Sequence, residues 1–160
     1  MMEIVPLVRW LHAIGAAALL GTGAGIAFFM VMAHRTGRPD VIAAVARIVV
    51  IADFAFTATA VIAQPITCYW LARSIGWDLS TGWLSLSLLL YVVAGLFWLP
   101  VVWIQIQLRD MAFASTTAGT PMPPRYHRLY RVWWISGFPA FCAIAIIYWL
   151  MLDRPVIDLP

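Results

Sequence analysis

Four long apolar runs fill most of this 160-residue chain and limit what it can fold into. Each run is about as long as the roughly 20 residues that an α-helix needs to cross the hydrocarbon core of a bilayer. The runs are Val5–Ala33, Ile48–Trp70, Trp83–Ile106 and Val132–Leu152. Only 11% of the residues are charged, and a water-soluble protein of this size needs a more polar surface. The sequence therefore predicts an integral membrane protein.

The segments between these runs are short, so the whole chain, residues 1–160, is predicted to form a single membrane domain. We expect an all-α, four-helix transmembrane bundle with up-down-up-down topology. The predicted helices cover about residues 5–33, 41–72, 83–109 and 129–152. The stretch Ala112–Tyr126 is rich in Ser, Thr, Gly and Pro and is predicted to be a loop.

The basic residues are ten arginines with no lysine, and their distribution predicts an orientation. Seven of them surround the connections after the first and third helices: Arg35, Arg38, Arg47, Arg109, Arg125, Arg128 and Arg131. The other side holds Arg9, Arg73 and Arg154 together with several acidic residues. Because basic loops stay in the cytoplasm, both termini are predicted to be periplasmic. Arginines grouped in this way indicate orientation rather than nucleic-acid binding, and the expected partner is the lipid bilayer.

Asp53 is the most conspicuous polar residue inside the apolar runs. It lies about five residues inside the second run, and a carboxylate at that depth costs several kcal/mol without a partner. Two roles stay open: an ion pair that joins helices, or a proton or ligand site. The predicted polar intramembrane cluster consists of Asp53, Arg47, Gln105, Arg109 and Arg131.

Two polar stripes follow helical spacing along the second and third runs. The stripe on the second run contains Asp53, Thr57, Gln64 and Cys68, and that on the third contains Ser87, Tyr91, Gly95, Trp98 and Gln105. If the stripes oppose each other, interhelical hydrogen bonds would form a polar seam. Each of the last three runs also contains a proline, and kinks at these prolines would leave room for a cavity: Pro65, Pro100 and Pro139.

His12, in the first run, is the strongest candidate for a cofactor ligand. The small residues Gly15 and Ala16 follow it by about one turn and would leave room for a flat macrocycle. Histidine is a common axial ligand of haem iron, so haem b is the predicted cofactor, with His12 on the iron. Tyr91 is a candidate for the opposite side. A hydrogen bond to a neighbouring helix is the alternative role for His12.

The other two histidines are predicted to lie at the cytoplasmic ends of the first and fourth helices. His34 and His127 would be close together there, either as metal ligands or as solvated residues at the membrane interface.

The order of several motifs resembles a family of small bacterial inner-membrane proteins, the domain of unknown function 2269. The motifs that carry this resemblance are Leu11–Ala16, Gly21 with Gly25, Arg47 with Asp53, Pro65–Thr67, Trp98–Val102, Tyr130–Trp134 and Gly137–Ala140. The resemblance covers nearly the whole chain and implies a multi-pass protein of the bacterial inner membrane.

The start of the first helix is also distantly similar to HemJ-type protoporphyrinogen oxidases and CopD-type copper-resistance proteins. The first of these resemblances implies a haem-ligand role for His12. The HemJ-type pattern also uses a lysine, which this chain lacks, so the sequence assigns no enzymatic reaction. We therefore expect a haem-binding protein of electron transfer or porphyrin handling, with a membrane redox partner or a second copy of the chain as partner. The alternative is a non-enzymatic accessory subunit or small transporter with an intramembrane Asp–Arg pair.

Overall fold

The computed structural model describes residues 4–157, and within this range the chain forms helices and no strand. The elements are α1 (Ile4–Arg35), α2 (Pro39–Ala52), the π-helix η1 (Asp53–Ala58), α3 (Thr59–Ile75), α4 (Gly82–Ala118) and α5 (Pro124–Asp153). Because α2, η1 and α3 follow one another without a break, the chain has four rods that are long and apolar enough to cross a membrane. The predicted all-α, four-helix transmembrane bundle is confirmed.

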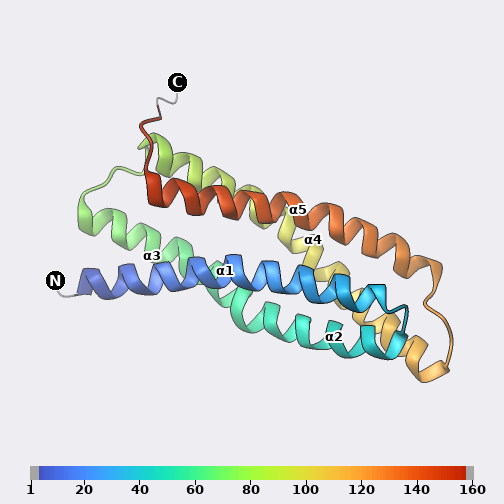
Figure 1. The fold of residues 1–160 in the computed structure, drawn as a ribbon. Coiled ribbons are helices and arrows are strands. Elements are labelled where there is room, and N and C mark those ends of the chain that lie inside the picture. The colour runs from blue at the N-terminus through green and yellow to red at the C-terminus, as the bar shows by residue number, and fades with distance from the viewer. Residues whose placement is uncertain (1–3, 158–160) are drawn as a thin grey trace.

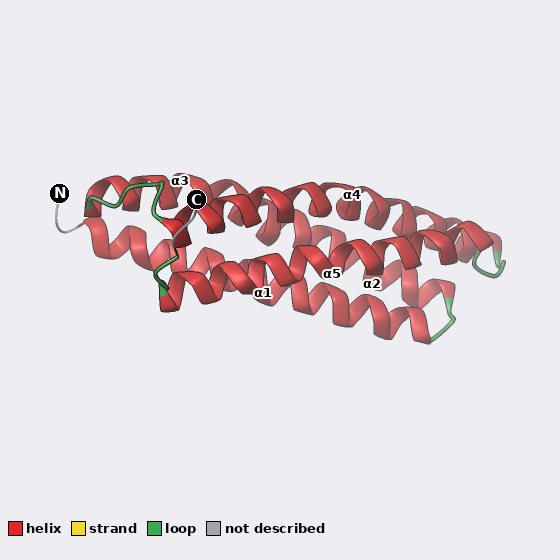
Figure 2. Ribbon diagram, turned by 90° about the horizontal axis from the view of Figure 1, so that it is seen from above, coloured by secondary structure: helices red, strands yellow, loops and turns green. Residues whose placement is uncertain are grey.

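The four rods run along one long axis and alternate in direction (Figures 1 and 2). The start of α1, the end of α5 and the connection 76–81 lie together at one end of the bundle, which we call the terminal end. The connections 36–38 and 119–123 lie at the other end, which we call the arginine-rich end. The up-down-up-down topology is therefore also confirmed.

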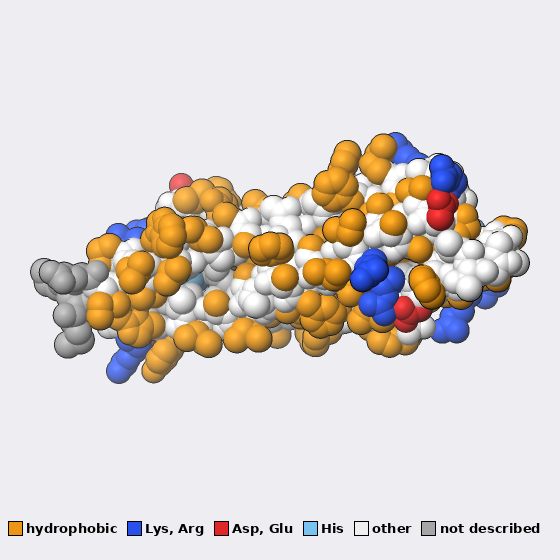
Figure 3. Space-filling model, turned by 90° about the horizontal axis from the view of Figure 1, so that it is seen from below, with side chains coloured by type: hydrophobic (Ala, Val, Ile, Leu, Met, Phe, Trp, Pro, Cys, Tyr) orange, Lys and Arg blue, Asp and Glu red, His pale blue; other side chains and the backbone are white. Residues whose placement is uncertain are grey.

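The surface of the bundle is mainly apolar along its middle, as expected for a protein surrounded by lipid. Large apolar side chains are exposed along the middle of every rod, as at Leu96, which is 67% exposed, and Ile135, which is 63% exposed. Figure 3 shows one face on which arginine and acidic side chains lie toward the two ends, with apolar and neutral atoms between them. Lipid chains are as apolar as these side chains, so the exposed surface carries no hydrophobic penalty in a bilayer.

The tightest packing lies in the half of the bundle next to the arginine-rich end. A single cluster there joins all the rods through buried residues such as Met30, Ile42, Leu108 and Tyr126. α4 packs extensively on both α5 and α2 in this region. Toward the terminal end, α3 packs on α1, and among the described residues its backbone stays apart from α4 and α5, which it meets through side chains such as Tyr91. The bundle is thus closed at one end and open between two helix pairs at the other.

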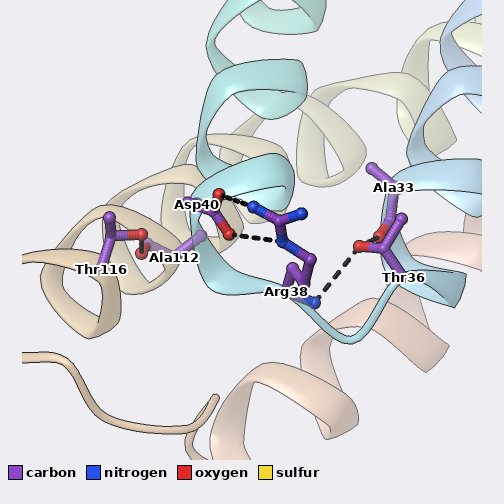
Figure 4. Close-up of polar contacts among 6 residues, drawn as sticks. All are labelled: Ala33, Thr36, Arg38, Asp40, Ala112 and Thr116. Atoms are coloured by element: carbon purple, nitrogen blue, oxygen red, sulfur yellow. Dashed lines mark hydrogen bonds and ion pairs between the residues drawn. The ribbon is translucent and has the colours of Figure 1, made fainter.

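A compact turn joins α1 to α2 at the arginine-rich end (Figure 4). The Thr36 hydroxyl donates a hydrogen bond to the Ala33 carbonyl and accepts one from the Arg38 backbone N–H. The Arg38 guanidinium donates to both carboxylate oxygens of Asp40, at 3.2 and 2.6 Å. This ion pair is exposed, so it fixes the turn more than it stabilises the fold.

The prediction of a loop over Ala112–Tyr126 is wrong at both ends. α4 continues to Ala118, because Ala112 packs in the core and the Thr116 hydroxyl bonds back to the Ala112 carbonyl (Figure 4). The helix ends where Gly119 takes a positive φ of 63°. α5 already begins at Pro124, where the missing N–H of proline costs the helix nothing.

Candidate functional site

Two cavities lie between the rods, one after the other along the bundle. The terminal cleft has a volume of about 300 Å³ and separates the α1–α3 pair from the α4–α5 pair near the terminal end. The central cavity has a volume of about 400 Å³ and is lined by all four rods near their middles. Tyr91 lines both cavities and donates a hydrogen bond to the Val61 carbonyl. Both volumes fall in the range of small-molecule sites.

His12 is buried in the wall of the terminal cleft and is held by α3. Its Nδ1 lies 2.7 Å from the Thr67 hydroxyl oxygen. That hydroxyl is also 2.8 Å from the Ala63 carbonyl, which can only accept, so the single hydroxyl proton points there. His12 Nδ1 therefore carries the proton and donates to Thr67. This tautomer leaves Nε2 with a free lone pair, the state that a metal-binding histidine needs.

Gly15 contributes in a way that differs from the prediction. A Cβ at this position would collide with the side-chain nitrogen of Gln64. That Gln64 nitrogen donates to the His12 carbonyl at 2.8 Å. The room expected beside Gly15 for a macrocycle is thus already filled by Gln64, and the glycine instead makes space for this side chain to reach from α3 to α1.

Cationic and aromatic side chains from four segments surround the terminal cleft near the terminal end. Arg9 lies one helical turn before His12, and Arg154 lies just after α5. The Arg154 guanidinium is 4.9 Å from the centre of the Trp77 ring, which stands edge-on to Trp83. Away from these groups the lining is mainly apolar. The cleft therefore suits an amphiphile with an apolar body and acidic groups.

Asp53 reaches the central cavity and is 3% exposed. Its carboxylate accepts a hydrogen bond from the Trp98 indole nitrogen at 3.3 Å, which joins the two predicted polar stripes. Among the described residues it takes part in no ion pair: Arg109 pairs with Asp110, and Arg47 and Arg131 are exposed. The predicted Asp–Arg pair is thus absent from this structure, because these arginines turn toward the surface and Asp53 turns inward.

Two further polar groups line the central cavity. Gln105 is 1% exposed, and its amide oxygen accepts a hydrogen bond from the Trp133 indole nitrogen at 3.1 Å. Its amide nitrogen has no partner in the described structure. Thr57 lies beside the Asp53 carboxylate, but its buried hydroxyl likewise makes no hydrogen bond of normal geometry to the residues around it.

Because of the π-helix η1, the polar stripe predicted for the second rod faces two different neighbours. A π-turn is wider than an α-turn and holds one extra residue, so residues beyond it are rotated relative to an unbroken α-helix. Asp53, at the start of η1, consequently meets Trp98 on α4. Gln64 and Thr67, beyond η1, meet His12 on α1. Without the wide turn, Asp53 and Gln64 would lie on one face.

His34 and His127 lie close together, as predicted, with ring centres 5.8 Å apart. The His34 ring stacks on Tyr130 at 3.7 Å, and its Nδ1 is 3.4 Å from the Tyr126 hydroxyl. Within residues 4–157 no group of three or more His, Cys, Asp or Glu side chains could hold a metal ion. The arrangement therefore favours helix packing at the interface over metal binding.

Two residues that line the terminal cleft, Arg9 and Arg154, were not assigned to a site from the sequence, and neither was Thr67, which bonds to His12. The two arginines could have been found from helical spacing. Arg9 is three residues from His12, and Arg154 is three residues from Met151, which also lines the cleft. The hydrogen bond to Thr67 depends on the rotation introduced by η1, which spacing alone does not reveal.

The fold and the two cavities define a small, four-span integral membrane protein with internal space for ligands. The chain belongs to the family described as a predicted integral membrane protein, DUF2269, whose model matches residues 6–155. No curated protein and no solved structure matches the chain. Its membership of a multi-pass membrane family is thus established, and its ligand has to be argued from the cavities.

Proposed function

We propose that this chain binds haem b, or a closely related metalloporphyrin, in the terminal cleft, with His12 as an axial ligand of the iron. The observation that carries the proposal is the hydrogen bond between His12 Nδ1 and Thr67. Haem-ligating histidines commonly donate the second ring N–H to a fixed acceptor, which sets the ring's orientation and raises the basicity of the ligating nitrogen.

The donor set of the cleft suits a porphyrin. The mainly apolar walls match the body of the macrocycle, and Arg9 and Arg154 supply two cations for its two carboxylates. Met151 also lines the cleft and offers a thioether, which paired with histidine is a known axial set for electron-transfer haems. Tyr91 is the less suitable second ligand, because its hydroxyl is bonded to the Val61 carbonyl.

Haem iron in such a site would exchange single electrons, and the protein residues would hold it and keep water away. A carrier of this kind needs a redox partner in the membrane, and a porphyrin-handling protein needs a donor and an acceptor. Both roles agree with a bacterial inner-membrane location, which we propose together with the function. A second copy of the chain is the alternative partner that we propose.

The test is the visible spectrum of the protein purified from haem-replete cells. The native chain should show a Soret band and a shift on reduction with dithionite, and His12→Ala should lose both. Thr67→Val should keep the fold but lower haem affinity by about 10- to 100-fold, the usual effect of losing such a second hydrogen bond. Thr59→Val is the matched control, because Thr59 is exposed and bonds only to carbonyls of its own rod, those of Ala55 and Phe56 in η1.

A colourless native protein that stays colourless after haemin is added would overturn the proposal. So would a Soret band that is unchanged in the folded His12→Ala variant, because the haem would then be held elsewhere.

A further inference from the structure

The central cavity contains two buried hydrogen-bond donors that make no hydrogen bond of normal geometry in the described structure. The orientation of Gln105 is set by Trp133: an indole N–H can only donate, so the amide oxygen faces Trp133 and the NH2 group is left without a partner. The second is the Thr57 hydroxyl, which lies beside the Asp53 carboxylate without a hydrogen bond of normal geometry. A buried amide or hydroxyl without a hydrogen bond costs about 1–3 kcal/mol, and two in one cavity indicate a missing acceptor.

The other lining residues indicate the shape and charge of the ligand that would supply this acceptor. Aromatic rings line it on several sides, including Trp98, Trp133, Phe138 and Phe141. The lining has no arginine or histidine, and Asp53 is its one acidic residue. An anionic head group would therefore lack a cation there and would be repelled by Asp53. A flat, neutral ring with carbonyl oxygens fits the wall better.

The cavity also has a route to the lipid. Its exposed lining residues come from two rods: Ala24 on α1, and Trp134, Phe138 and Phe141 on α5. α1 and α5 make only limited contact with each other, so the opening lies between them. A ligand with an alkyl or isoprenoid tail could place its ring inside and leave the tail among the lipid chains.

We propose that the central cavity binds the head group of a membrane quinone. One quinone carbonyl accepts a hydrogen bond from the Gln105 amide nitrogen, and the aromatic side chains pack on the ring. The opposite carbonyl accepts a hydrogen bond from the Thr57 hydroxyl. Asp53 stands beside this carbonyl and can accept a hydrogen bond from the hydroxyl of the reduced form. The site uses neither His12 nor the terminal cleft, so it does not depend on haem binding.

The experiment measures quenching of tryptophan fluorescence by decylubiquinone, because tryptophans line the cavity and quinones quench indoles. The protein carries His12→Ala, is held in nanodiscs, and is titrated with decylubiquinone or with decylbenzene, which has a tail but no carbonyl. Decylubiquinone should quench saturably. Thr57→Val, and Gln105→Met compared with a Trp133→Phe parent, should each raise its Kd by about 3- to 10-fold, as expected for one lost hydrogen bond.

The two variants are chosen so that the fold survives. Thr57→Val replaces a hydroxyl, which makes no hydrogen bond of normal geometry, with a methyl group of similar size. In the Trp133→Phe parent no indole N–H needs the Gln105 oxygen, so Gln105→Met leaves no buried donor without its partner. Thr59→Val is the control, since Thr59 lies on the exposed side of the same rod. Equal Kd values for all variants, quenching that never saturates, or equally tight binding of decylbenzene would each overturn the proposal. Tighter binding of a cationic amphiphile than of decylubiquinone would do so too, because Asp53 would then be the main recognition group.

Discussion

At the scale of single residues, Gly15 shows how a helix contact and a candidate ligand are linked. Gln64 fills the space beside this glycine and donates to the carbonyl of His12. An alanine at position 15 would push the Gln64 amide away from the His12 carbonyl and weaken or break this hydrogen bond. The bridge that Gln64 makes from α3 to the backbone of His12 therefore depends on the absence of a side chain at Gly15.

We predict that Gly15→Ala destabilises the protein by about 1–3 kcal/mol, the cost of a buried amide without a partner. Thermal unfolding in detergent, followed by circular dichroism, measures the change. Gly21→Ala is the control on the same helix: a Cβ there meets nothing within 4 Å, so helix propensity should make the variant equally or slightly more stable.

A double mutant tests whether the effect of Gly15→Ala comes from its collision with Gln64. In a Gln64→Ala background the collision is gone, so adding Gly15→Ala should cost little. If the two substitutions destabilise additively, Gly15 and Gln64 are not coupled and the explanation is wrong.

At the scale of elements, the π-helix η1 decides which neighbours the second rod can reach. Its wide turn accommodates one residue more than an α-turn. Removing one residue from η1 should therefore restore a plain α-helix while both flanking helices keep their faces. Removing a residue from a regular α-helix instead rotates everything beyond it by about 100°.

We predict that deletion of Ala55, an exposed residue of η1, changes the free energy of unfolding by no more than about 1 kcal/mol, close to the effect of an exposed substitution. Deletion of Ile62, an exposed residue of α3, should prevent stable folding, because Gln64 and Thr67 would turn away from His12. Expression in membranes and melting temperature report both results. Equal damage from the two deletions would show that η1 does not hold a surplus residue.

The elements also show what the sequence could and could not predict. The four apolar runs were sufficient for the number of helices and their alternation, because only helices of that length satisfy the backbone in lipid. The prediction that Asp53 and Gln64 share one face assumed regular α-helical spacing. The π-helix over Asp53–Ala58 breaks that spacing, and because this segment contains no glycine or proline, the sequence does not reveal it. The expected Asp–Arg pair is not seen, for a related reason. The direction in which a long arginine side chain points depends on its packing, which cannot be predicted from helical spacing.

At the scale of the whole molecule, stability and space for ligands are found at different places along the bundle. The large buried side chains gather toward the arginine-rich end, where all the rods meet. The middle and the terminal end hold the two cavities, the buried histidine and the buried carboxylate. A tightly packed end can hold the helices together while the other end leaves room for ligands. Substitutions in the cavities should therefore affect binding more than folding.

The same lengthwise division predicts how the molecule sits in the membrane. Seven of the ten arginines belong to the arginine-rich end, and the start of α1, the end of α5 and the connection 76–81 share the opposite end. Under the positive-inside rule the arginine-rich end is cytoplasmic and the terminal end is periplasmic. The terminal cleft with His12 would then lie in the periplasmic half of the bilayer.

Reporter fusions check this orientation in bacterial cells. Alkaline phosphatase fused after Pro160 should be active, and a fluorescent protein that folds only in the cytoplasm should be dark at that position. Inserted after Gly119, between α4 and α5, the two reporters should give the opposite result. Replacing Arg125, Arg128 and Arg131 with glutamine should lower the bias and produce a mixed population. Phosphatase activity at Gly119 and none at Pro160 would invert the orientation and move His12 to the cytoplasmic half.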